Sequence, residues 1–331
     1  MKNFSLLNTG TLALGMLLLG SCAKNNGSAP SITNIAVTNP DFQLLEDAAI
    51  RGGVAITLGN KNPNDPQGNY TVFAPNNSAF NRLGIREAVD LTALQPSFLT
   101  NTLLYHVFSG NLAGSALTPG STSPSALGAT ITRRIIQRPD GSLYVNGSKI
   151  LGTDVQAANG LVHPIDKVLI ATGGNVVESA IALQTQKVFV NPELTFLVAA
   201  VVKCNLQGLL SQPGPYTVFA PSDQAFINAG IPSIAAINSL DAAGVANLTA
   251  ILANHVLAGS LGNKFTPELP ESMSVTAFSG RRLLFGPFDR GGLTVKYVNP
   301  NPSVVTTPAN MVIPDIQCTN GVVHVIDRVL N

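Results

Sequence analysis

The stretch YTVFAP at residues 70–75 returns at residues 216–221, and this repetition decides how the chain is organised. The likeness extends beyond six letters, because ten of the sixteen residues from 70 to 85 are identical to those from 216 to 231. A short β-rich run that ends at proline is typical of a strand, since proline cannot donate to a strand ladder. Two such strands, 146 residues apart, indicate that the chain carries the same domain twice.

Two further blocks repeat in the same order along the chain. Residues 103–112 match residues 252–261 at five of ten positions, and residues 159–170 match residues 320–331 at eight of twelve. All four histidines of the chain fall inside these blocks. Ordered blocks with a spacing of roughly 150 residues indicate two homologous domains rather than an array of short repeats.

The same elements are expected in each domain. Apolar residues on one face predict an opening helix from residue 42 to residue 51. The Asn-Gly pairs at 159–160 and 320–321 are strong hairpin signals, and each leads into a last strand. Further helices are expected at 96–106 and 242–255, and paired strands at 131–137 and 143–146. Early helices and late strands predict an α+β fold for two domains, at residues 39–171 and 174–331.

The amino terminus has the features of a bacterial lipoprotein signal. An apolar run at residues 12–19 is shorter than the roughly 20 residues of a membrane helix, which is typical of a signal peptide. The sequence LGSC at residues 19–22 resembles a lipobox, whose cysteine is acylated. We therefore predict a signal peptide at residues 1–21, a lipid anchor on Cys22 and a flexible tether at residues 22–38. The alternative is an ordinary secretory signal with a chance cysteine.

The charge balance argues against a polyanionic partner. The chain has 331 residues with 19 Lys and Arg against 18 Asp and Glu, and only 11% of its residues are charged. Removal of the signal peptide takes away Lys2 and leaves a net side-chain charge of zero. Without a positive field the chain has nothing to attract nucleic acid, so we expect no nucleic-acid partner. Low charge is also typical of an exported, sheet-rich protein.

Cys204 and Cys318 are the two cysteines that remain beside Cys22. An envelope compartment permits a disulfide between them, but two cysteines do not make a disulfide framework. They either pair within the second domain or serve as two small buried apolar residues, and the sequence favours neither alternative.

The usual catalytic patterns are missing from the sequence, among them His-Glu-x-x-His, Gly-x-Ser-x-Gly and a phosphate-binding loop. Neighbouring acids such as Glu268 and Glu271 are interpreted as solvated surface. His106 and His255 each lie on the apolar face of an expected helix. That position is typical of a core histidine that donates a hydrogen bond to a backbone carbonyl.

Two His-Asp pairs, His163 with Asp166 and His324 with Asp327, resemble catalytic dyads. A separation of three along a strand places the two side chains on opposite faces, so neither pair can meet without a bulge. Two histidines in each domain without a clustered third ligand also make a poor metal site. We expect no catalytic residue, no cofactor and no metal. A hydrolase built on these dyads is a rival hypothesis that requires the side chains to meet in a cleft.

The repeated motifs TVFAPxxxAF, xHV and NGxVHxIDxVL resemble the fasciclin-like domains of fasciclin I, periostin and the transforming-growth-factor-induced protein. The resemblance covers nearly all of the chain after residue 22, and each of the three motifs occurs twice. It implies two tandem α+β domains, each a β-wedge or sandwich with several helices. It also implies adhesion through extracellular protein contacts, without catalysis.

Two adhesive motifs of the animal family have matches here. A Tyr-His pair implicated in integrin contact matches Tyr105 and His106, and a Pro-Asp-Ile segment matches Pro314, Asp315 and Ile316. The other domain departs from each motif. We favour the interpretation that both motifs serve the fold, the histidine through burial and the aspartate through a turn.

Together these observations favour a non-catalytic adhesion or protein-interaction lipoprotein of a bacterial cell envelope, anchored at the periplasmic or surface face of the outer membrane. Its partner would be an extracellular or envelope protein. The alternative is a glycan-binding accessory lipoprotein of a polysaccharide-uptake system. Carbohydrate sites favour aromatic platforms, and the chain has no Trp and only five Tyr, which weighs against this alternative.

Overall fold

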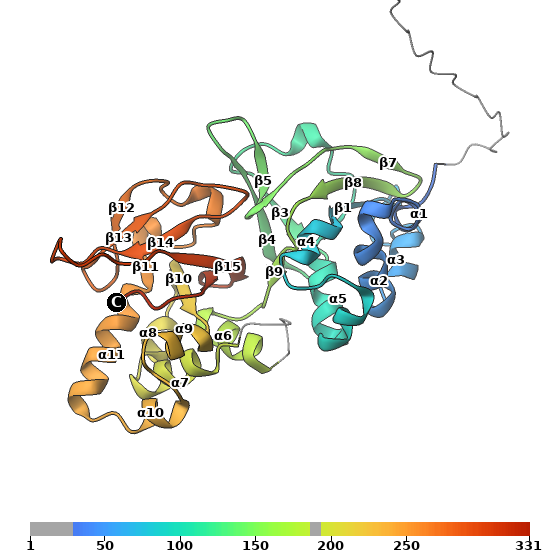
Figure 1. Ribbon diagram of the computed structural model, residues 1–331. Coiled ribbons are helices and arrows are strands. Elements are labelled where there is room, and N and C mark those ends of the chain that lie inside the picture. The colour runs from blue at the N-terminus through green and yellow to red at the C-terminus, as the bar shows by residue number, and fades with distance from the viewer. Residues whose placement is uncertain (1–28, 186–192) are drawn as a thin grey trace, which may run out of the picture.

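The computed structural model describes residues 29–185 and 193–331. The expected signal peptide and the expected lipidated residue, Cys22, lie outside the described residues. Figure 1 shows two halves, each with its own helices and sheets. Within the described ranges, no helix is both long and apolar enough to cross a membrane.

The first domain begins with helices and ends with strands. Its helices are α1 (Ile32–Thr38), α2 (Gln43–Arg51), α3 (Ala55–Gly59), α4 (Asn77–Asn81) and α5 (Pro96–Tyr105), with 3₁₀ turns at Pro40–Phe42, Ala88–Ala93 and Gly114–Ala116. Its strands are β1 (Tyr70–Pro75), β2 (Val107–Ser109), β3 (Thr122–Ser125), β4 (Gly128–Gln137), β5 (Leu143–Val145), β6 (Ser148–Lys149), β7 (Val155–Ala157), β8 (Gly160–Ile165) and β9 (Ile170–Ala171).

The second domain repeats this order. Its helices are α6 (Val176–Thr185), α7 (Thr195–Lys203), α8 (Gln207–Leu210), α9 (Asp223–Asn228), α10 (Ile234–Asn238) and α11 (Ala242–Asn254), with 3₁₀ turns at Gly259–Leu261 and Thr266–Glu268. Its strands are β10 (Tyr216–Pro221), β11 (Val256–Ala258), β12 (Ser274–Thr276), β13 (Arg282–Phe285), β14 (Thr294–Tyr297), β15 (Ala309–Cys318) and β16 (Gly321–Ile326). The expected α+β class is confirmed.

A parallel pair of strands forms the centre of each domain. β1 runs parallel to β8, from Tyr70 opposite Gly160 to Pro75 opposite Ile165. β10 and β16 repeat this arrangement. The expected hairpins at the two Asn-Gly pairs are confirmed as β7–β8 and β15–β16. The parallel pairing joins strands that are far apart in the sequence, and the local patterns did not predict it.

The sheets of the two domains are connected. The first domain has the sheets β2-β1-β8-β7 and β3-β4-β5-β6, whereas the second has one eight-stranded sheet. Seven of its strands follow the order β11-β10-β16-β15-β14-β13-β12. The eighth is β9 of the first domain, which pairs in parallel with β15 and places Ile170 opposite Ile316. The last strand of the first domain therefore belongs to the sheet of the second.

The Asn-Gly turns hold the helices against the central strands. The Asn159 side chain accepts a hydrogen bond from the first residue of α1 at 2.9 Å and donates to two carbonyls at the end of α3, at 2.8 and 2.6 Å. Asn320 makes the same three bonds to α6 and to the end of α8. Glycine must follow, because a Cβ on Gly160 would lie 1.7 Å from the carbonyl oxygen of Tyr70.

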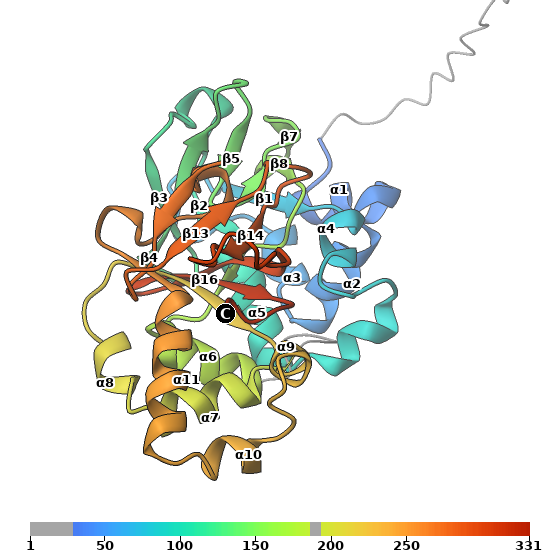
Figure 2. The same ribbon diagram turned by 60° about the vertical axis from the view of Figure 1, so that its left-hand side comes forward.

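Most of the core lies between the helices and one face of each central sheet. In the second domain, α6–α11 lie together under the sheet in both views (Figures 1 and 2). Leu197 and Leu252 from these helices pack with Val323 of the sheet. In the first domain Leu45 and Leu103 pack in the same way with Val162.

The structure differs from the expected tether in its second half. Residues Ile32–Thr38 form helix α1, and the side chain of the N-cap residue Ser31 accepts a hydrogen bond from the backbone N–H of Asn34 at 3.3 Å. The Ile32 side chain is buried against the domain. The polar composition of this segment hid a short helix that is stabilised by its contacts with the rest of the domain rather than by its own propensity.

Cys204 and Cys318 are free thiols, and both are buried in the core of the second domain. Burial raises the pKa of the Cys318 thiol to about 12. The sequence left open whether these cysteines form a disulfide or are small buried apolar residues, and in the structure they are the latter.

Candidate functional site

The Tyr105-His106 pair lies in the core of the first domain. Both side chains are fully buried. The Tyr105 hydroxyl donates to the Thr132 carbonyl at 3.2 Å and accepts a hydrogen bond from the Asn146 amide at 2.7 Å. Neither side chain is available on the surface for a partner.

The His106 side chain joins helix α5 to the end of the first domain through two hydrogen bonds. Its Nδ1 donates to the Thr102 carbonyl at 2.7 Å, and its Nε2 accepts a hydrogen bond from Leu169 N–H at 2.9 Å. His255 makes the equivalent bonds to Ile251 and Leu330. Because Nε2 must accept, each ring is neutral with its proton on Nδ1. Burial lowers the pKa of both histidines to about 4.

The Pro314-Asp315-Ile316 segment lies at the contact between the two domains. Ile316 is fully buried in the second core, and Pro314 is half-buried. Asp315 adopts a left-handed backbone conformation with φ of 70° and donates its N–H to Nδ1 of His324 at 3.1 Å. Its carboxylate oxygen Oδ1 accepts a hydrogen bond from the N–H of Thr266 at 2.6 Å.

The first domain contains the same arrangement around Asp154. This residue also has a positive φ, of 62°, and donates its N–H to Nδ1 of His163 at 3.1 Å. Its Oδ1 accepts from Gly114 N–H at 2.8 Å. His163 and His324 therefore each support a turn of the repeated fold.

The side chains of the two His-Asp dyads lie apart. Asp166 accepts hydrogen bonds from Lys149 N–H and the Ser148 hydroxyl and lies 3.5 Å from the Arg82 guanidinium, whereas His163 donates through Nε2 to the Leu112 carbonyl. In the second domain Asp327 binds Asn310, and His324 donates to the Lys264 carbonyl. Among the described residues, no group of three His, Cys, Asp or Glu side chains lies close enough to hold a metal ion.

A buried ion pair joins the two domains. The Lys167 ammonium of the first domain lies 2.7 Å from Oδ2 of Asp315 in the second, and both side chains are less than one-tenth exposed. Lys167 also donates to the Thr266 hydroxyl at 3.1 Å and to the Gly291 carbonyl. Burial alone would raise the pKa of the Asp315 carboxyl, but the Lys167 charge, His324 and the hydrogen bonds outweigh it and lower that pKa.

Glycine lets the two backbones approach each other at this point. A Cβ on Gly147 of the first domain would lie 1.9 Å from the Asp315 carboxylate. The carboxylate is therefore enclosed from one side by the β5–β6 turn and from the other by the Thr266–Glu268 turn. Both of its oxygens accept hydrogen bonds from within the chain, Oδ1 from Thr266 N–H and Oδ2 from Lys167 and the Thr266 hydroxyl.

Two arginines extend this junction, Arg134 in β4 and Arg138 directly after its end. Arg134 lies 2.5 Å from Glu268 and over the ring of Phe265, with its guanidinium carbon 5.1 Å from the ring centroid. Arg138 lies 2.6 Å from Glu271. The interpretation as solvated surface fails for Glu268, which is partly buried against Arg134, whereas Glu271 is exposed and pairs with Arg138 at the edge of the junction.

The sequence reasoning missed the junction, although a signal was present. Lys167, Arg134 and Arg138 contact the second domain, and the last two carry like charges four positions apart in the sequence. Glu268 and Glu271 are likewise spaced to present two carboxylates together. Complementary pairs on the two repeats could have been sought in the sequence.

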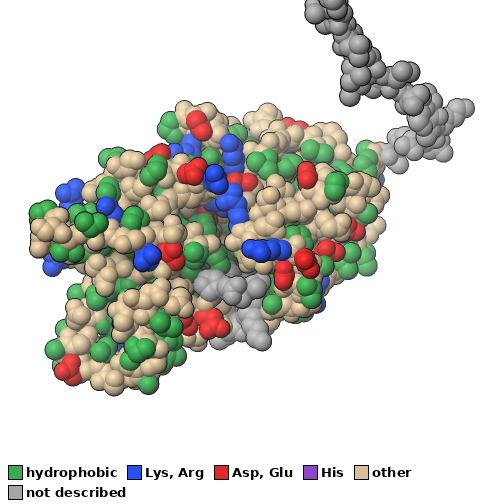
Figure 3. Space-filling view, viewed as in Figure 1, with side chains coloured by type: hydrophobic (Ala, Val, Ile, Leu, Met, Phe, Trp, Pro, Cys, Tyr) green, Lys and Arg blue, Asp and Glu red, His purple; other side chains and the backbone are tan. Residues whose placement is uncertain are grey.

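A cleft of about 470 Å³ lies beside the ion pair and is lined by both domains. Arg82 and Lys167 contribute from the first domain, and Asp289, Arg290 and Pro314 from the second. Arg82 donates across the cleft to the Arg290 carbonyl at 2.8 Å. Figure 3 shows Lys and Arg side chains gathered along the junction between the two halves on this face, with acidic side chains among them.

Comparisons with known proteins agree with the repeated motifs. The model of the fasciclin domain family matches residues 40–171 and again residues 192–331. Transforming growth factor-beta-induced protein ig-h3 of Sus scrofa is 28% identical over 263 residues, which are 80% of this chain and 35% of that protein. The chain thus spans little more than a third of the length of this relative.

Two further similarities concern a bacterial protein and a solved structure. An uncharacterized protein of Synechocystis is 32% identical over 157 residues, which are 47% of this chain and 96% of that protein. A solved fasciclin domain pair from the insect cell adhesion molecule fasciclin I has 18% sequence identity and a TM-score of 0.36, over 90% of this chain and 95% of that one.

Replacement of Lys167 by Met should lower the free energy of unfolding by about 3–5 kcal/mol, because the Asp315 carboxylate then stays buried without its cation. Urea denaturation at pH 7 measures this loss. The matched control is Arg290→Ala, whose side chain is 89% exposed and 3.7 Å from an exposed partner, Asp289. The control should change stability by no more than about 0.5 kcal/mol. Equal stability of the two variants would contradict the role given to Lys167.

Lowering the pH from 7 to 4.5 should destabilise the protein through His106 and His255. Their folded-state pKa of about 4 lies below the value of 6.5 for a free histidine, so the unfolded chain binds protons first. The stabilisation is complete above about pH 6.5 and is lost as the pH falls toward 4, with about 2–3 kcal/mol lost for each histidine at pH 4.5. Urea midpoints across this range measure the effect. A His106→Gln variant should be less stable than the wild type at pH 7 and should lose less of its stability between pH 7 and pH 4.5. A wild-type urea midpoint that does not change over this pH range would contradict the role given to the two histidines.

Proposed function

Since the chain belongs to the fasciclin domain family, we propose that it is a non-catalytic protein-interaction module held by a lipid anchor in a bacterial cell envelope. Fasciclin domains are linked to cell adhesion and protein interaction. The observation that carries the proposal is the junction, where the Lys167–Asp315 pair and the β9–β15 pairing join both domains into one body with an open cleft.

The cleft between the domains is the proposed surface for the partner. Clefts at domain interfaces are frequent binding sites, and a cleft with a fixed shape costs less ordering when a partner binds. Arg82 and Arg290 line it together with Asp289 and the apolar side chains of Met311 and Val312. Charges of both signs beside apolar surface suit a protein segment better than a polyanion.

The same lining weighs against the glycan-binding alternative. None of the described residues that line the cleft carries an aromatic ring on which a sugar would stack. Tyr105, the residue of the Tyr-His motif, is buried away from the surface. Of the Pro-Asp-Ile motif, only Pro314 lines the cleft.

The proposed anchor at Cys22 would keep the first domain close to the membrane. The backbone is fixed from Pro30 onward, because its carbonyl accepts a hydrogen bond from Ala158 N–H at 2.9 Å. Pro30 lies eight positions after Cys22, and at roughly 3.3–3.6 Å for each step the chain between them spans at most about 29 Å. The membrane would therefore lie near the α1 and β7 end of the first domain.

The anchor is tested with the full chain expressed in a Gram-negative bacterium. We expect the wild-type protein in the membrane fraction with the mass of an acylated chain that starts at Cys22, and the Cys22→Ser variant in the soluble fraction. Cys204→Ser is the matched control, because it removes a buried thiol and should leave the protein on the membrane. A Cys22→Ser protein that stays on the membrane would refute the anchor.

The partner surface is tested by affinity capture from envelope extract with the soluble Cys22→Ser chain. Arg290→Glu should reduce recovery of the captured protein at least tenfold, since it reverses one charge at the cleft. Arg281→Glu makes the same charge change at an exposed position outside the cleft and should retain the partner. No enrichment over an unrelated lipoprotein, or equal loss in both variants, would count against the cleft.

A further inference from the structure

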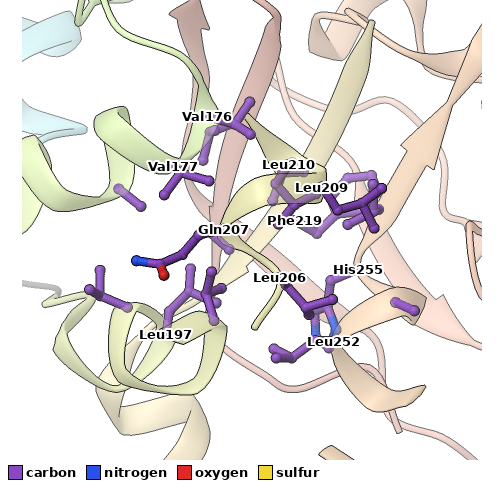
Figure 4. Close-up of a pocket in the computed structure, with 18 of the residues that line it drawn as sticks. Val176, Val177, Leu197, Leu206, Gln207, Leu209, Leu210, Phe219, Leu252 and His255 are labelled. Atoms are coloured by element: carbon purple, nitrogen blue, oxygen red, sulfur yellow. The ribbon is translucent and has the colours of Figure 1, made fainter. Parts of the chain in front are cut away.

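The second domain contains an apolar pocket of about 240 Å³ beneath its central sheet. Helices α6, α7, α8 and α11 surround it, and β10 and β16 form its floor with Val218, Ala220 and Val323. None of the described residues that line it is charged. Figure 4 shows Val177, Leu197 and Leu252 around the space.

Three of the described lining residues have polar atoms in their side chains. The Thr249 hydroxyl donates to the Val245 carbonyl at 2.8 Å, and both ring nitrogens of His255 are used in its hydrogen bonds with Ile251 and Leu330. The third is Gln207, whose amide extends toward the space between Val177 and Leu197 (Figure 4). This amide has no hydrogen bond within the described part of the chain, so it is available to a ligand.

The first domain provides an internal comparison. A pocket at the equivalent place, lined by Val72, Leu103 and Val162, measures only about 80 Å³. Its lining includes a carboxylate, Glu46. The second domain has Val198 at the corresponding position, 152 residues later, and its pocket is three times larger.

The size and lining of the larger pocket restrict its occupant. An apolar cavity of about 150 Å³ holds one benzene molecule, and a water-sized group occupies about 30 Å³. A pocket of about 240 Å³ therefore has room for roughly eight carbon-sized groups. A peptide helix, about 10 Å across, is too wide. A charged head group would find no counter-ion in the lining, whereas a neutral one can reach the Gln207 amide.

We propose that this pocket binds a single aliphatic chain of about eight carbons with a neutral hydrogen-bonding head group, the chain lying over Val218 and Val323 and the head at Gln207. The site is independent of the cleft and of the partner proposed above. The smaller pocket of the first domain does not bind the same ligand, because it lacks the volume and carries Glu46.

The first experiment measures chain-length dependence. Isothermal titration calorimetry of the full chain carrying Cys22→Ser, which bears no acyl group of its own, is run with 1-butanol, 1-hexanol, 1-octanol and 1-dodecanol. Each added methylene should tighten binding roughly fourfold until the pocket is full near eight carbons, after which the affinity should level off. No saturable heat with 1-octanol, or an affinity that rises evenly through 1-dodecanol, would overturn the proposal.

The second experiment uses variants taken from the comparison of the two domains. Val198→Glu gives the larger pocket the carboxylate of the smaller one and should weaken 1-octanol binding at least tenfold. Glu46→Val makes the reverse change in the first domain and should leave binding unchanged, because that pocket is too small. Ala180→Phe fills the larger pocket from another helix and should also abolish binding, which keeps the test valid where Val198→Glu fails to fold.

The head group is tested with Gln207→Leu. This variant should lose the preference of the site for 1-octanol over n-octane while still binding the hydrocarbon. Binding of 1-octanol to Val198→Glu or to Ala180→Phe with wild-type affinity, in a protein that unfolds at the wild-type temperature, would show that the ligand lies elsewhere. An unchanged preference in Gln207→Leu would remove the assigned role of the amide.

Discussion

Each domain depends on the close contact between an Asn-Gly turn and the first residue of its central strand. Tyr70 N–H donates to the Asn159 carbonyl at 2.9 Å, and the missing side chain of Gly160 lets the two backbones meet. This contact sets the register of the parallel β1–β8 pair and therefore brings the end of the domain back to its beginning. The Asn159 side chain then fixes α1 and α3, and His106 fixes the residues after β8. In each domain, segments from the beginning and the end of the repeat therefore contact each other through hydrogen bonds.

The two copies diverged where they meet. Asp154 and Asp315 have the same backbone conformation and the same bond to a histidine, yet only Asp315 faces a lysine of the other domain. A residue that supports a turn in one copy thus also joins the domains in the other. The two copies also differ away from their contact, because the small pocket of the first domain is lined by Glu46 and the larger pocket of the second by Val198.

The repeated motifs allowed the domain number, the class of fold, the hairpins and the main helices to be predicted, because these features follow from local patterns. The parallel β1–β8 pairing could not be predicted in that way, since its partners are about ninety residues apart and periodicity reports only the face on which a residue lies. Helix α1 was not predicted, because it is held in place by a single buried isoleucine, Ile32, and by tertiary hydrogen bonds rather than by a sequence pattern. The spacing of the charges at Arg134 and Glu268 is visible in the sequence, but their pairing depends on how the two domains are placed, which local patterns do not give.

The position of β9 gives the molecule a mechanical character. This strand ends the first domain in sequence, but its hydrogen bonds go to β15 of the second, next to the buried ion pair. A pull on the second domain would therefore reach the first through bonds that lie side by side and resist together, rather than through a slack connecting segment. Under tension the two domains would therefore respond as one mechanical unit.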